Sequence, residues 1–333
     1  MRSLLARYPG LAAALSRVDL RVRETAVERW RVDGVSILIK RDDLSTPSFG
    51  GNKARALEML LTGAGPDVTV LTVGAEGSTH ALAVAHFARR LGAACEVITW
   101  PQETNEISLR TAARLSEAAT VTRTRSVVEA YVRATVRRFR RGTFWVPAGG
   151  SVPRGALAHV NAALELVDQL ERDGLDMPAY VVVPLGTGGT AAGLLVGLSI
   201  ARVRTRLVAV RVVPRIVANR ARVLRLARRT RRLLERLAGE TIPPCDAEIL
   251  EIDESAYGGA YGWETPAAQA AALALHEAGG PTLDATYSAK AFGVALRRAQ
   301  ALGDGSVLFW LTFDARWLAA AESPAPPVSQ PGY

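Results

Sequence analysis

Short apolar runs alternate with longer amphipathic segments along most of this chain of 333 residues. The runs are rich in valine, leucine and isoleucine, which is typical of strands that are covered on both faces of a parallel sheet. The pattern predicts strands at residues 35–39, 68–73, 95–99, 144–146, 180–183, 207–212, 249–252 and 307–311.

The segments between these runs carry their apolar residues at the spacing of one helix face. They predict helices at residues 53–61, 78–91, 103–116, 127–139, 154–170, 190–200, 266–277 and 289–301, with one more in the arginine-rich segment 202–236. Strand and helix thus alternate almost throughout, which predicts an α/β fold with open, parallel-rich sheets flanked by helices. In such folds, ligands bind at the loops beyond the carboxyl ends of the strands.

Length and composition are those of an ordinary globular protein and exclude several other classes. A chain of 333 residues is long for one hydrophobic core, so two domains are expected. No uncharged apolar run reaches the roughly 18 residues of a membrane span, and the first 15 residues lack a clear signal cleavage site. Residues 322–333 are rich in proline and polar residues, which predicts a disordered tail.

Cysteine usage and charge narrow the expected ligands. Cys95 and Cys245 form neither a metal-binding spacing nor a disulfide framework, so we expect no metal site and a reducing, cytoplasmic location. Much of the net charge of +9 comes from residues 202–236, which hold 13 arginines. Apolar residues recur there at helical spacing and no aromatic residues interleave, so we interpret the segment as an amphipathic helix and expect no nucleic-acid site.

Lysine is scarce: 38 of the 41 basic residues are arginine, and only Lys40, Lys53 and Lys290 remain. Codon bias explains the scarcity but not the positions. A lysine amine can attack a carbonyl, which an always-protonated guanidinium cannot do. Lys53 follows Gly50-Gly51-Asn52, where we expect Asn52 to cap a helix whose positive end disfavours the ammonium form. We therefore interpret Lys53 as a functional amine, whereas spacing defines no role for Lys40 or Lys290.

A loop rich in glycine and hydroxyl groups, residues 74–80, follows the strand predicted at residues 68–73. Ser78 or Thr79 would cap the next helix and expose backbone N–H groups that suit a carboxylate. Plain helix capping explains Ser78 equally well. We interpret His80 as a partly buried histidine with its hydrogen bonds satisfied rather than as a base.

A second such loop, Gly186-Thr187-Gly188-Gly189-Thr190, joins a predicted strand to a predicted helix. Its backbone N–H groups and the helix dipole would form an anion cradle. The residues match neither the P-loop pattern nor GxGxxG, so we interpret the loop as a phosphate site, with a tight turn as the alternative. A reactive lysine and a phosphate cradle on an α/β scaffold indicate pyridoxal phosphate, whose ring serves as an electron sink.

The segment 284–290 is a further candidate for the site. Ser288 can cap the helix that follows, and Tyr287 would lie just outside that helix. Tyr257 and Tyr261 stand in a glycine-rich loop and are further candidates for lining the site. The alternative is an ordinary loop with packed tyrosines.

These segments, spread from residue 39 to residue 312, resemble the fold-type II pyridoxal-phosphate enzymes that include D-cysteine desulfhydrase and 1-aminocyclopropane-1-carboxylate deaminase. The most specific matches are Lys40-Arg41-Asp42-Asp43-Leu44 and Gly50-Gly51-Asn52-Lys53-Ala54-Arg55; residues 147–151 and 283–287 match further landmarks. The resemblance implies a homodimer with a tryptophan synthase β-like fold. It implies a large cofactor domain of residues 1–56 and 162–321, with a small α/β domain of residues 57–161 inserted after the lysine.

The resemblance also implies a role for individual side chains, with Lys53 as the Schiff-base lysine. The cofactor-binding residues it implies are Asn52, Lys53, Thr79, Gly186, Thr187, Gly188, Gly189, Thr190, Tyr287 and Thr312. The substrate-binding residues it implies are Ser78, Thr79, His80 and Ser288. The catalytic residues it implies are Lys53, Ser78, Tyr287 and Tyr261.

The activity that this resemblance implies is that of a lyase or deaminase acting on a small amino acid. Lys53 would take the Cα proton, a β-substituent such as thiolate would leave, and a keto acid and ammonia would result. Ser288 stands where the cyclopropane deaminases have glutamate, which favours the desulfhydrase-like reaction. Thr79 replaces an asparagine, and Phe313-Asp314 replaces two glycines. Cyclopropane deaminase, dehydratase, racemase, and a cofactor-binding protein without turnover therefore stay open as alternatives.

Overall fold

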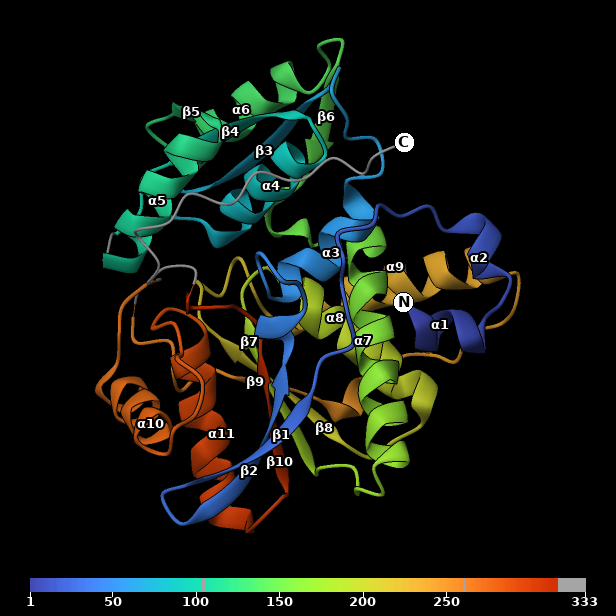
Figure 1. Cartoon of the computed structure of the whole chain (residues 1–333), viewed down its shortest axis with the longest axis vertical. Coiled ribbons are helices and arrows are strands. Elements are labelled where there is room, and N and C mark those ends of the chain that lie inside the picture. Colours follow the sequence, from blue (N-terminus) through green and yellow to red (C-terminus); the bar gives the residue numbers. More distant parts are fainter. Residues whose placement is uncertain (104–105, 260–261, 317–333) are drawn as a thin grey trace, which may run out of the picture.

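The protein is built on two parallel-rich β-sheets that lie at opposite ends of its long axis (Figure 1). The structure is a computed structural model and describes residues 1–103, 106–259 and 262–316. Figure 1 shows helix α3 (Asn52–Leu60) between the two sheets, where it packs against helices of both halves.

The larger sheet has six strands. In spatial order they are β1 (Val27–Val32), β2 (Val35–Arg41), β10 (Val307–Leu311), β7 (Tyr180–Leu185), β8 (Arg206–Arg211) and β9 (Leu250–Asp253). Only β1 is antiparallel to its neighbour, and every other pairing is parallel. The carboxyl ends of β2, β10, β7 and β8 therefore share one edge of the sheet.

Helices cover both faces of this sheet, because alternate side chains of each strand point to opposite faces. Val181 and Val183 pack into a core with α1 (Arg2–Arg7), α7 (Pro153–Arg172), α8 (Gly189–Ala201) and α9 (Arg220–Ala238). Val182, between them, packs instead with α10 (Pro266–Glu277) and α11 (Ser288–Leu302). The short α2 (Leu11–Ala14) lies against α9.

The smaller sheet has four parallel strands. In spatial order they are β5 (Thr120–Arg123), β4 (Ala94–Trp100), β3 (Thr69–Ala75) and β6 (Thr143–Val146). Val70 and Val97 pack with α3, α4 (Thr79–Arg90) and α5 (Glu106–Ala118), and Leu71 and Ile98 pack with α6 (Val127–Arg137) on the other face. Three single-turn 3-10 helices complete the described elements: η1 (Asp42–Leu44), η2 (Ala148–Gly150) and η3 (Ala247–Ile249).

The predicted α/β fold with parallel-rich, helix-covered sheets is confirmed, and each predicted strand has a counterpart. The pattern did not reveal β1, β5 or the short α1 and α2. β1 is an edge strand in which charged residues alternate with apolar ones, and β5 is only four residues long. The predicted domain limits at residues 56/57 and 161/162 fall within α3 and α7, and the division stays a prediction. Residues 322–333 lie outside the described residues.

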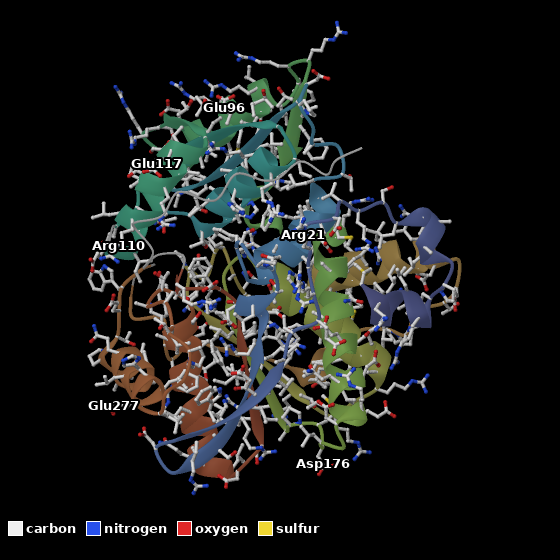
Figure 2. The ribbon with its side chains drawn as sticks, viewed as in Figure 1. Arg21, Glu96, Arg110, Glu117, Asp176 and Glu277 are labelled. Atoms are coloured by element: carbon white, nitrogen blue, oxygen red, sulfur yellow. The ribbon has the colours of Figure 1, made fainter. Side chains whose placement is uncertain are left out.

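Charged residues occupy the outside of the molecule, as a globular fold requires. Arg110, Glu117, Asp176 and Glu277 are exposed and point outward in Figure 2. The arginine-rich segment forms α9, whose Val223, Leu224 and Leu234 are buried, so the expected amphipathic helix is confirmed. Among the described helices, none combines the length and the apolar character that crossing a bilayer requires.

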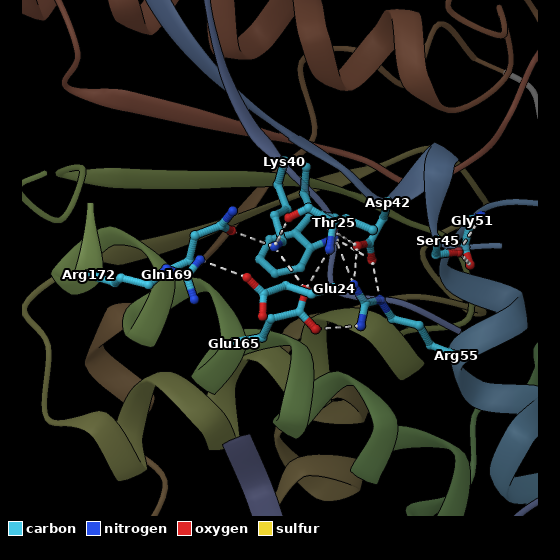
Figure 3. A network of polar contacts seen from close by, with 11 residues as sticks. Glu24, Thr25, Lys40, Asp42, Ser45, Gly51, Arg55, Glu165, Gln169 and Arg172 are labelled. Carbon is cyan, nitrogen blue, oxygen red and sulfur yellow. Dashed lines mark hydrogen bonds and ion pairs between the residues drawn. The ribbon is translucent and has the colours of Figure 1, made fainter. Parts of the chain in front are cut away.

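A buried network of charges ties α3 to the larger sheet (Figure 3). Arg55 donates to the carboxylates of Asp42 and Glu165, and Lys40 donates to Glu165 Oε1 at 2.9 Å. All four side chains are less than 9% exposed, and two cations face two carboxylates. Asp42 also accepts from the indole N–H of Trp310 at 2.8 Å. The network therefore links β2, α3, α7 and β10 and fixes the helix that begins with Asn52 and Lys53.

Candidate active site

The loops singled out in the sequence meet between the two sheets, because each follows the carboxyl end of a parallel strand. In the larger sheet, residues 42–52 follow β2, residues 186–190 follow β7 and Thr312 follows β10. In the smaller sheet, residues 76–78 follow β3 and residues 147–152 follow β6. Hydrogen bonds of Ser151 to Thr187 and Gly189 join a loop of the smaller sheet to a loop of the larger one.

Lys53 enters the site from the first turn of α3, directly after a strained glycine. Gly51 has a φ of +128°, and a Cβ there would lie 2.5 Å from the carbonyl oxygen of Thr312. The backbone N–H of Asn52 donates to that same oxygen at 2.9 Å. Only glycine therefore permits the approach that places Lys53 beside the end of β10.

The predicted capping role of Asn52 is wrong. Gly51 occupies the N-cap position of α3, and Asn52 is already the first helical residue. Its buried side chain instead donates from Nδ2 to the hydroxyl of Thr190 at 2.8 Å. Asn52 therefore connects the start of α3 to the first turn of α8, and it places Lys53 next to residues 186–190.

The electrostatic surroundings of Lys53 favour a neutral amine. Its side chain is half-buried, and withdrawal from water lowers its pKa from 10.5 to about 8. An ion pair with a carboxylate would oppose that shift, and within the described ranges Lys53 forms none. The position at a helix start acts in the same direction, since the positive end of the helix dipole disfavours a further cation. A substantial fraction of neutral amine is thus present near neutral pH.

Residues 186–190 form a cradle at the start of α8. Gly188 is the left-handed N-cap of this helix, with φ of +93°. The first N–H groups of a helix have no acceptor within it, so they are free to bind an anion. One of them, from Gly189, donates to the hydroxyl of Ser151 at 3.0 Å, and Ser151 also shares a 2.6 Å hydrogen bond with Thr187. The Ser151 hydroxyl group, from the loop after β6, therefore forms part of the cradle.

The close contact of the two loops predicts the effect of Gly149→Ala. A Cβ at Gly149 would lie 2.1 Å from the hydroxyl oxygen of Thr187, so the cradle must shift. We expect the affinity of apoprotein for pyridoxal phosphate to fall about tenfold, as for loss of one hydrogen bond. The matched control is Gly174→Ala, because Gly174 has nearly the same φ (+66° against +67°) but an added Cβ meets nothing within 4 Å. Absorbance titration measures both affinities, and equal weakening in the two variants would contradict the prediction.

The start of α4 presents a second set of unbonded N–H groups. Ser78 is the N-cap, and its hydroxyl accepts from the N–H of Ala81 at 3.3 Å. This leaves the N–H groups of Thr79 and His80 without an acceptor inside the helix. The helix end therefore has the geometry that suits a carboxylate, beside the cleft that Thr79 lines.

His80 is buried, and the backbone of Pro147 beside it opposes the lowering of its pKa. Neither ring nitrogen forms a hydrogen bond of normal geometry among the described residues, so the sequence interpretation of a satisfied histidine stays a prediction. Burial and the nearby charge of Lys53 lower the pKa of His80 to about 3, so the imidazole is neutral at physiological pH. An unpaired buried polar group is costly, so these nitrogens suit a ligand that brings a hydrogen-bonding group.

Tyr287 and Ser288 stand at the start of α11 but have different surroundings. Tyr287 is half-buried, lines the cleft and faces Gly186, where a Cβ would lie 3.4 Å from its ring. Ser288 is fully buried, and its hydroxyl donates to Asp284, which also accepts the backbone N–H groups of Tyr287 and Ser288. The predicted capping role of Ser288 is wrong, because Tyr287 is the N-cap of α11 and Ser288 is its first helical residue. The substrate-binding role of Ser288 stays a prediction.

A cleft lies between the two halves of the molecule, beside these residues. Its described lining is Gly77, Thr79, Gln102, Glu103, Ile107, Ser108, Gly262, Asp284, Thr286, Tyr287 and Phe313. Phe313 thus lines the cleft, whereas Asp314 pairs with Arg316 at 2.8 Å. Sequence reasoning missed Gln102, and it included Asp284 only as part of the candidate segment 284–290. Ser151 was signalled only by the match of residues 147–151 to a family landmark.

Of two further predicted residues, only Tyr257 is described, and it does not line the cleft. The predicted site residue Tyr261 falls outside the described residues. Tyr257 stacks under Arg211, with the guanidinium 4.4 Å from the ring centre. Its carbonyl accepts from Nζ of the buried Lys290 at 3.0 Å. Lys290 therefore has a structural contact, holding the loop that follows β9 against α11.

The residues present fit pyridoxal phosphate. The cradle of residues 186–190 suits its phosphate, and a side chain at Gly149 or Gly189 would intrude on that cradle. Lys53 offers an amine with a lowered pKa, and the unpaired His80 nitrogens lie near it. The roles of the individual residues stay predictions.

Comparison with known proteins agrees with this fit. Residues 18–312 match the family described as "Pyridoxal-phosphate dependent enzyme". The chain is 34% identical to nocardicin C-9′ epimerase of Nocardia uniformis subsp. tsuyamanensis, over 94% of this chain and 97% of that protein. It is 32% identical to D-cysteine desulfhydrase of Serratia proteamaculans, over 93% and 94%. A crystal structure of an ACC deaminase homologue superposes with a TM-score of 0.74 at 28% identity, covering 94% and 95%.

Proposed function

We infer, from the premise that this chain belongs to the family of pyridoxal-phosphate dependent enzymes, that it is a lyase or deaminase acting on a small amino acid. The reaction we propose is β-elimination, which releases a keto acid and ammonia. The observation that carries this proposal is the half-buried amine of Lys53, with its pKa lowered to about 8, adjoining a phosphate-type cradle. The similarity to a D-cysteine desulfhydrase supports the choice of reaction.

Lys53 has two tasks in this proposal. Its amine would hold the cofactor, and as a neutral amine it would take the proton from Cα of the substrate. Bound pyridoxal phosphate supplies an electron sink that stabilises the negative charge left at Cα. Both tasks of Lys53 require an unprotonated nitrogen, which the lowered pKa provides.

Neighbouring residues bind and orient the reactants. The N–H groups at the start of α8, with Thr187, Gly188 and Thr190, would hold the phosphate. The N–H groups of Thr79 and His80, with the Ser78 hydroxyl, would hold the substrate carboxylate at the start of α4.

Three side chains would enclose the cofactor ring. Asn52 is fixed by Thr190, Thr312 is buried at the end of β10, and Tyr287 faces Gly186. His80 stays neutral, so it adds a dipole rather than a charge beside the amine. We propose no step for Tyr261.

The lowered pKa of Lys53 predicts the pH dependence of cofactor attachment. Only the neutral amine attacks the aldehyde, so the rate should rise about tenfold per pH unit up to pH about 8 and then level off. Stopped-flow absorbance of apoprotein mixed with pyridoxal phosphate measures this rate. Free Nα-acetyl-lysine is the control, and its rate should keep rising towards pH 10. A protein profile that follows the control would contradict the assigned surroundings of Lys53.

A second candidate is epimerisation at Cα, and one observation favours it. The relative with 34% identity over nearly the whole length of both chains is named as an epimerase. Epimerisation and β-elimination both begin with removal of the Cα proton, so the Lys53 geometry supports each. They differ in whether a β-substituent then leaves or a proton returns to the other face of Cα.

The experiment that tests the proposal separates these outcomes. Purified protein should be yellow with pyridoxal phosphate bound, and a panel of D- and L-amino acids should be assayed for keto acid and ammonia. The same panel in deuterium oxide, followed by NMR, reports exchange and inversion at Cα. Keto acid release identifies elimination, and inversion without release identifies epimerisation. A protein that stays colourless with added cofactor contradicts the whole proposal.

The proposal includes a homodimer in the cytoplasm. Cys95 and Cys245 are both free thiols, which supports a reducing compartment. The family resemblance of the sequence supports the dimer. Sedimentation velocity of the holoprotein tests the oligomeric state, and a monomer at micromolar concentration would contradict it.

A further inference from the structure

The charge of the cleft is opposite to that of the protein. The chain has a net charge of +9, yet no arginine or lysine is among the described residues that line the cleft. Two carboxyl groups, of Glu103 and Asp284, do line it. Burial raises the pKa of Asp284, which leaves the exposed Glu103 as the main source of negative charge there. In a chain with this many arginines, such a lining sets a local potential that repels a second anionic group on the substrate.

Gln102 contributes an unused acceptor to this lining. Its amide Nε2 donates to the backbone carbonyl of Glu76, which fixes the orientation of the side-chain amide. Its Oε1 is thereby directed elsewhere, is buried, and has no hydrogen-bond partner among the residues that the structure describes. A buried acceptor without a donor is costly, so this oxygen fits a ligand that brings a donor.

The two carboxylates differ in what they can offer such a ligand. Asp284 is buried and accepts from the backbone N–H groups of Tyr287 and Ser288, so its oxygens are already used. Glu103 is exposed at the cleft, and its Oε2 accepts from the indole N–H of Trp263. That bond holds the carboxylate in place, and among the described residues no donor bonds to its Oε1.

Other charges near the cleft do not reverse this preference. Glu76 pairs with Arg123 at 3.4 Å, and the Arg123 side chain is 69% exposed, so its charge is largely screened by water. Lys53 lies at the start of α3 and is committed, under the proposed function, to the cofactor and the Cα proton. The wall of the cleft formed by Gln102 and Glu103 therefore offers hydrogen-bond acceptors and negative charge.

We propose that this cleft selects amino acids whose side chain ends in an amino group, with Gln102 and Glu103 as the specificity-determining residues. The proposal rests on the proposed function, since the α-carboxylate must bind at the start of α4 for the side chain to reach this wall. The ammonium group would donate to Gln102 Oε1 and to Glu103. An acidic side chain of the same length would meet the same two acceptors without a donor.

The experiment compares three amino acids of matched length with the holoprotein: 2,4-diaminobutyrate, homoserine and aspartate, each as both enantiomers. Binding is read from the change in the absorbance of the bound cofactor and, independently of any turnover, by calorimetry. We expect the dissociation constant to be lowest for diaminobutyrate and at least about tenfold higher for aspartate, as for hydrogen bonds to a charged group. Equal constants, or tightest binding of aspartate, would overturn the proposal.

Variants of Gln102 and Glu103 test whether these two residues cause the preference for a terminal amino group. Gln102→Met keeps the length of the side chain but removes the acceptor, and Glu103→Gln removes the charge. Each should reduce the ratio of the two dissociation constants by about threefold or more. The matched control is Glu106→Gln, because Glu106 is 77% exposed, pairs with Arg110 and does not line the cleft. A preference that persists in both variants would overturn the assignment to Gln102 and Glu103.

The same titrations distinguish failure of this proposal from failure of the proposed function. If the protein stays colourless, or no amino acid changes its absorbance, the proposed function is wrong and the substrate preference fails with it. If all three amino acids change the absorbance with equal affinity, the proposed function stands and only the preference for a terminal amino group is wrong.

Discussion

Replacing Lys53 with alanine should remove the yellow absorbance of the bound cofactor and lower turnover by at least about 10³-fold, within the range for loss of a positioned acid–base group and of a covalent attachment. The expected loss follows from the surroundings of Lys53, since no second amine is placed to replace it. Lys40 and Lys290 are buried and hydrogen-bonded elsewhere, to Glu165 and to the carbonyl of Tyr257. Activity is measured as keto acid and ammonia release, or as exchange at Cα.

Two controls separate chemistry from folding in this experiment. Lys53→Arg keeps a long cationic side chain but not the nucleophilic amine, so it should be as inactive as Lys53→Ala. Thermal unfolding of the apoprotein should change little in either variant, because Lys53 forms no ion pair within the described ranges. Retention of more than a tenth of the activity in either variant would show that another group takes the Cα proton.

The sequence was sufficient for the layered fold and for the loops that form the site. Valine-rich runs such as residues 180–183 are buried on both faces, and this requirement makes a central parallel strand recognisable. The carboxyl ends of such strands meet at one edge, so the glycine-rich loop at residues 186–190 was correctly expected near a ligand site. β1 was not predicted, because an edge strand with one solvated face has no such continuous apolar run.

The pattern of apolar and polar residues could not predict the partners of these side chains, because the partners depend on the three-dimensional fold. Asn52 looks like a helix cap, yet its amide reaches Thr190, which is 138 residues away in the chain. Ser288 looks like a substrate contact, yet its hydroxyl donates to Asp284. In each case the fold determines the hydrogen-bond partner of the side chain, and the local spacing of residues does not predict that partner.

The scarcity of lysine acquires a physical explanation at Lys40, one of the two positions where spacing gave none. Lys40 is fully buried, and its three Nζ contacts are Thr25 O, Glu165 Oε1 and Gln169 Oε1, at 2.6 to 2.9 Å. Three acceptors around one point match the three donors of an ammonium group, whereas a planar guanidinium would need a wider arrangement. Packing and hydrogen bonding therefore account for Lys40, and the proposed chemistry accounts for Lys53.

The buried network around Lys40 leads to the second large expected effect, which concerns stability. Glu165→Gln should lower the free energy of unfolding by about 3–5 kcal/mol, because it leaves Lys40 and Arg55 buried with only Asp42 to compensate two positive charges. Urea unfolding of the apoprotein measures this change. The variant keeps the shape of the side chain, so the loss reports charge rather than a cavity.

The control is the same substitution at an exposed ion pair. Glu24 pairs with Arg172 at 2.8 Å, with side chains 42% and 57% exposed, so Glu24→Gln should cost at most about 1 kcal/mol. Both variants change the net charge equally, which removes the effect of overall charge. Similar losses in the two variants would show that the buried network contributes no more than a surface pair.

The pH dependence of stability gives an independent test of the same network. Burial opposes the charged form of Glu165, but the charges of Arg55 and Lys40 outweigh it and lower the pKa of Glu165 from 4.5 to about 2. Because the folded pKa lies below the unfolded one, the stabilisation is fully present above pH 4.5 and is lost as the pH falls towards 2. Wild-type protein should therefore lose stability more steeply than Glu165→Gln over this interval. Parallel curves for the two proteins would contradict a charged Glu165 in the folded state, and with it the two-cation, two-carboxylate balance that holds α3 in place.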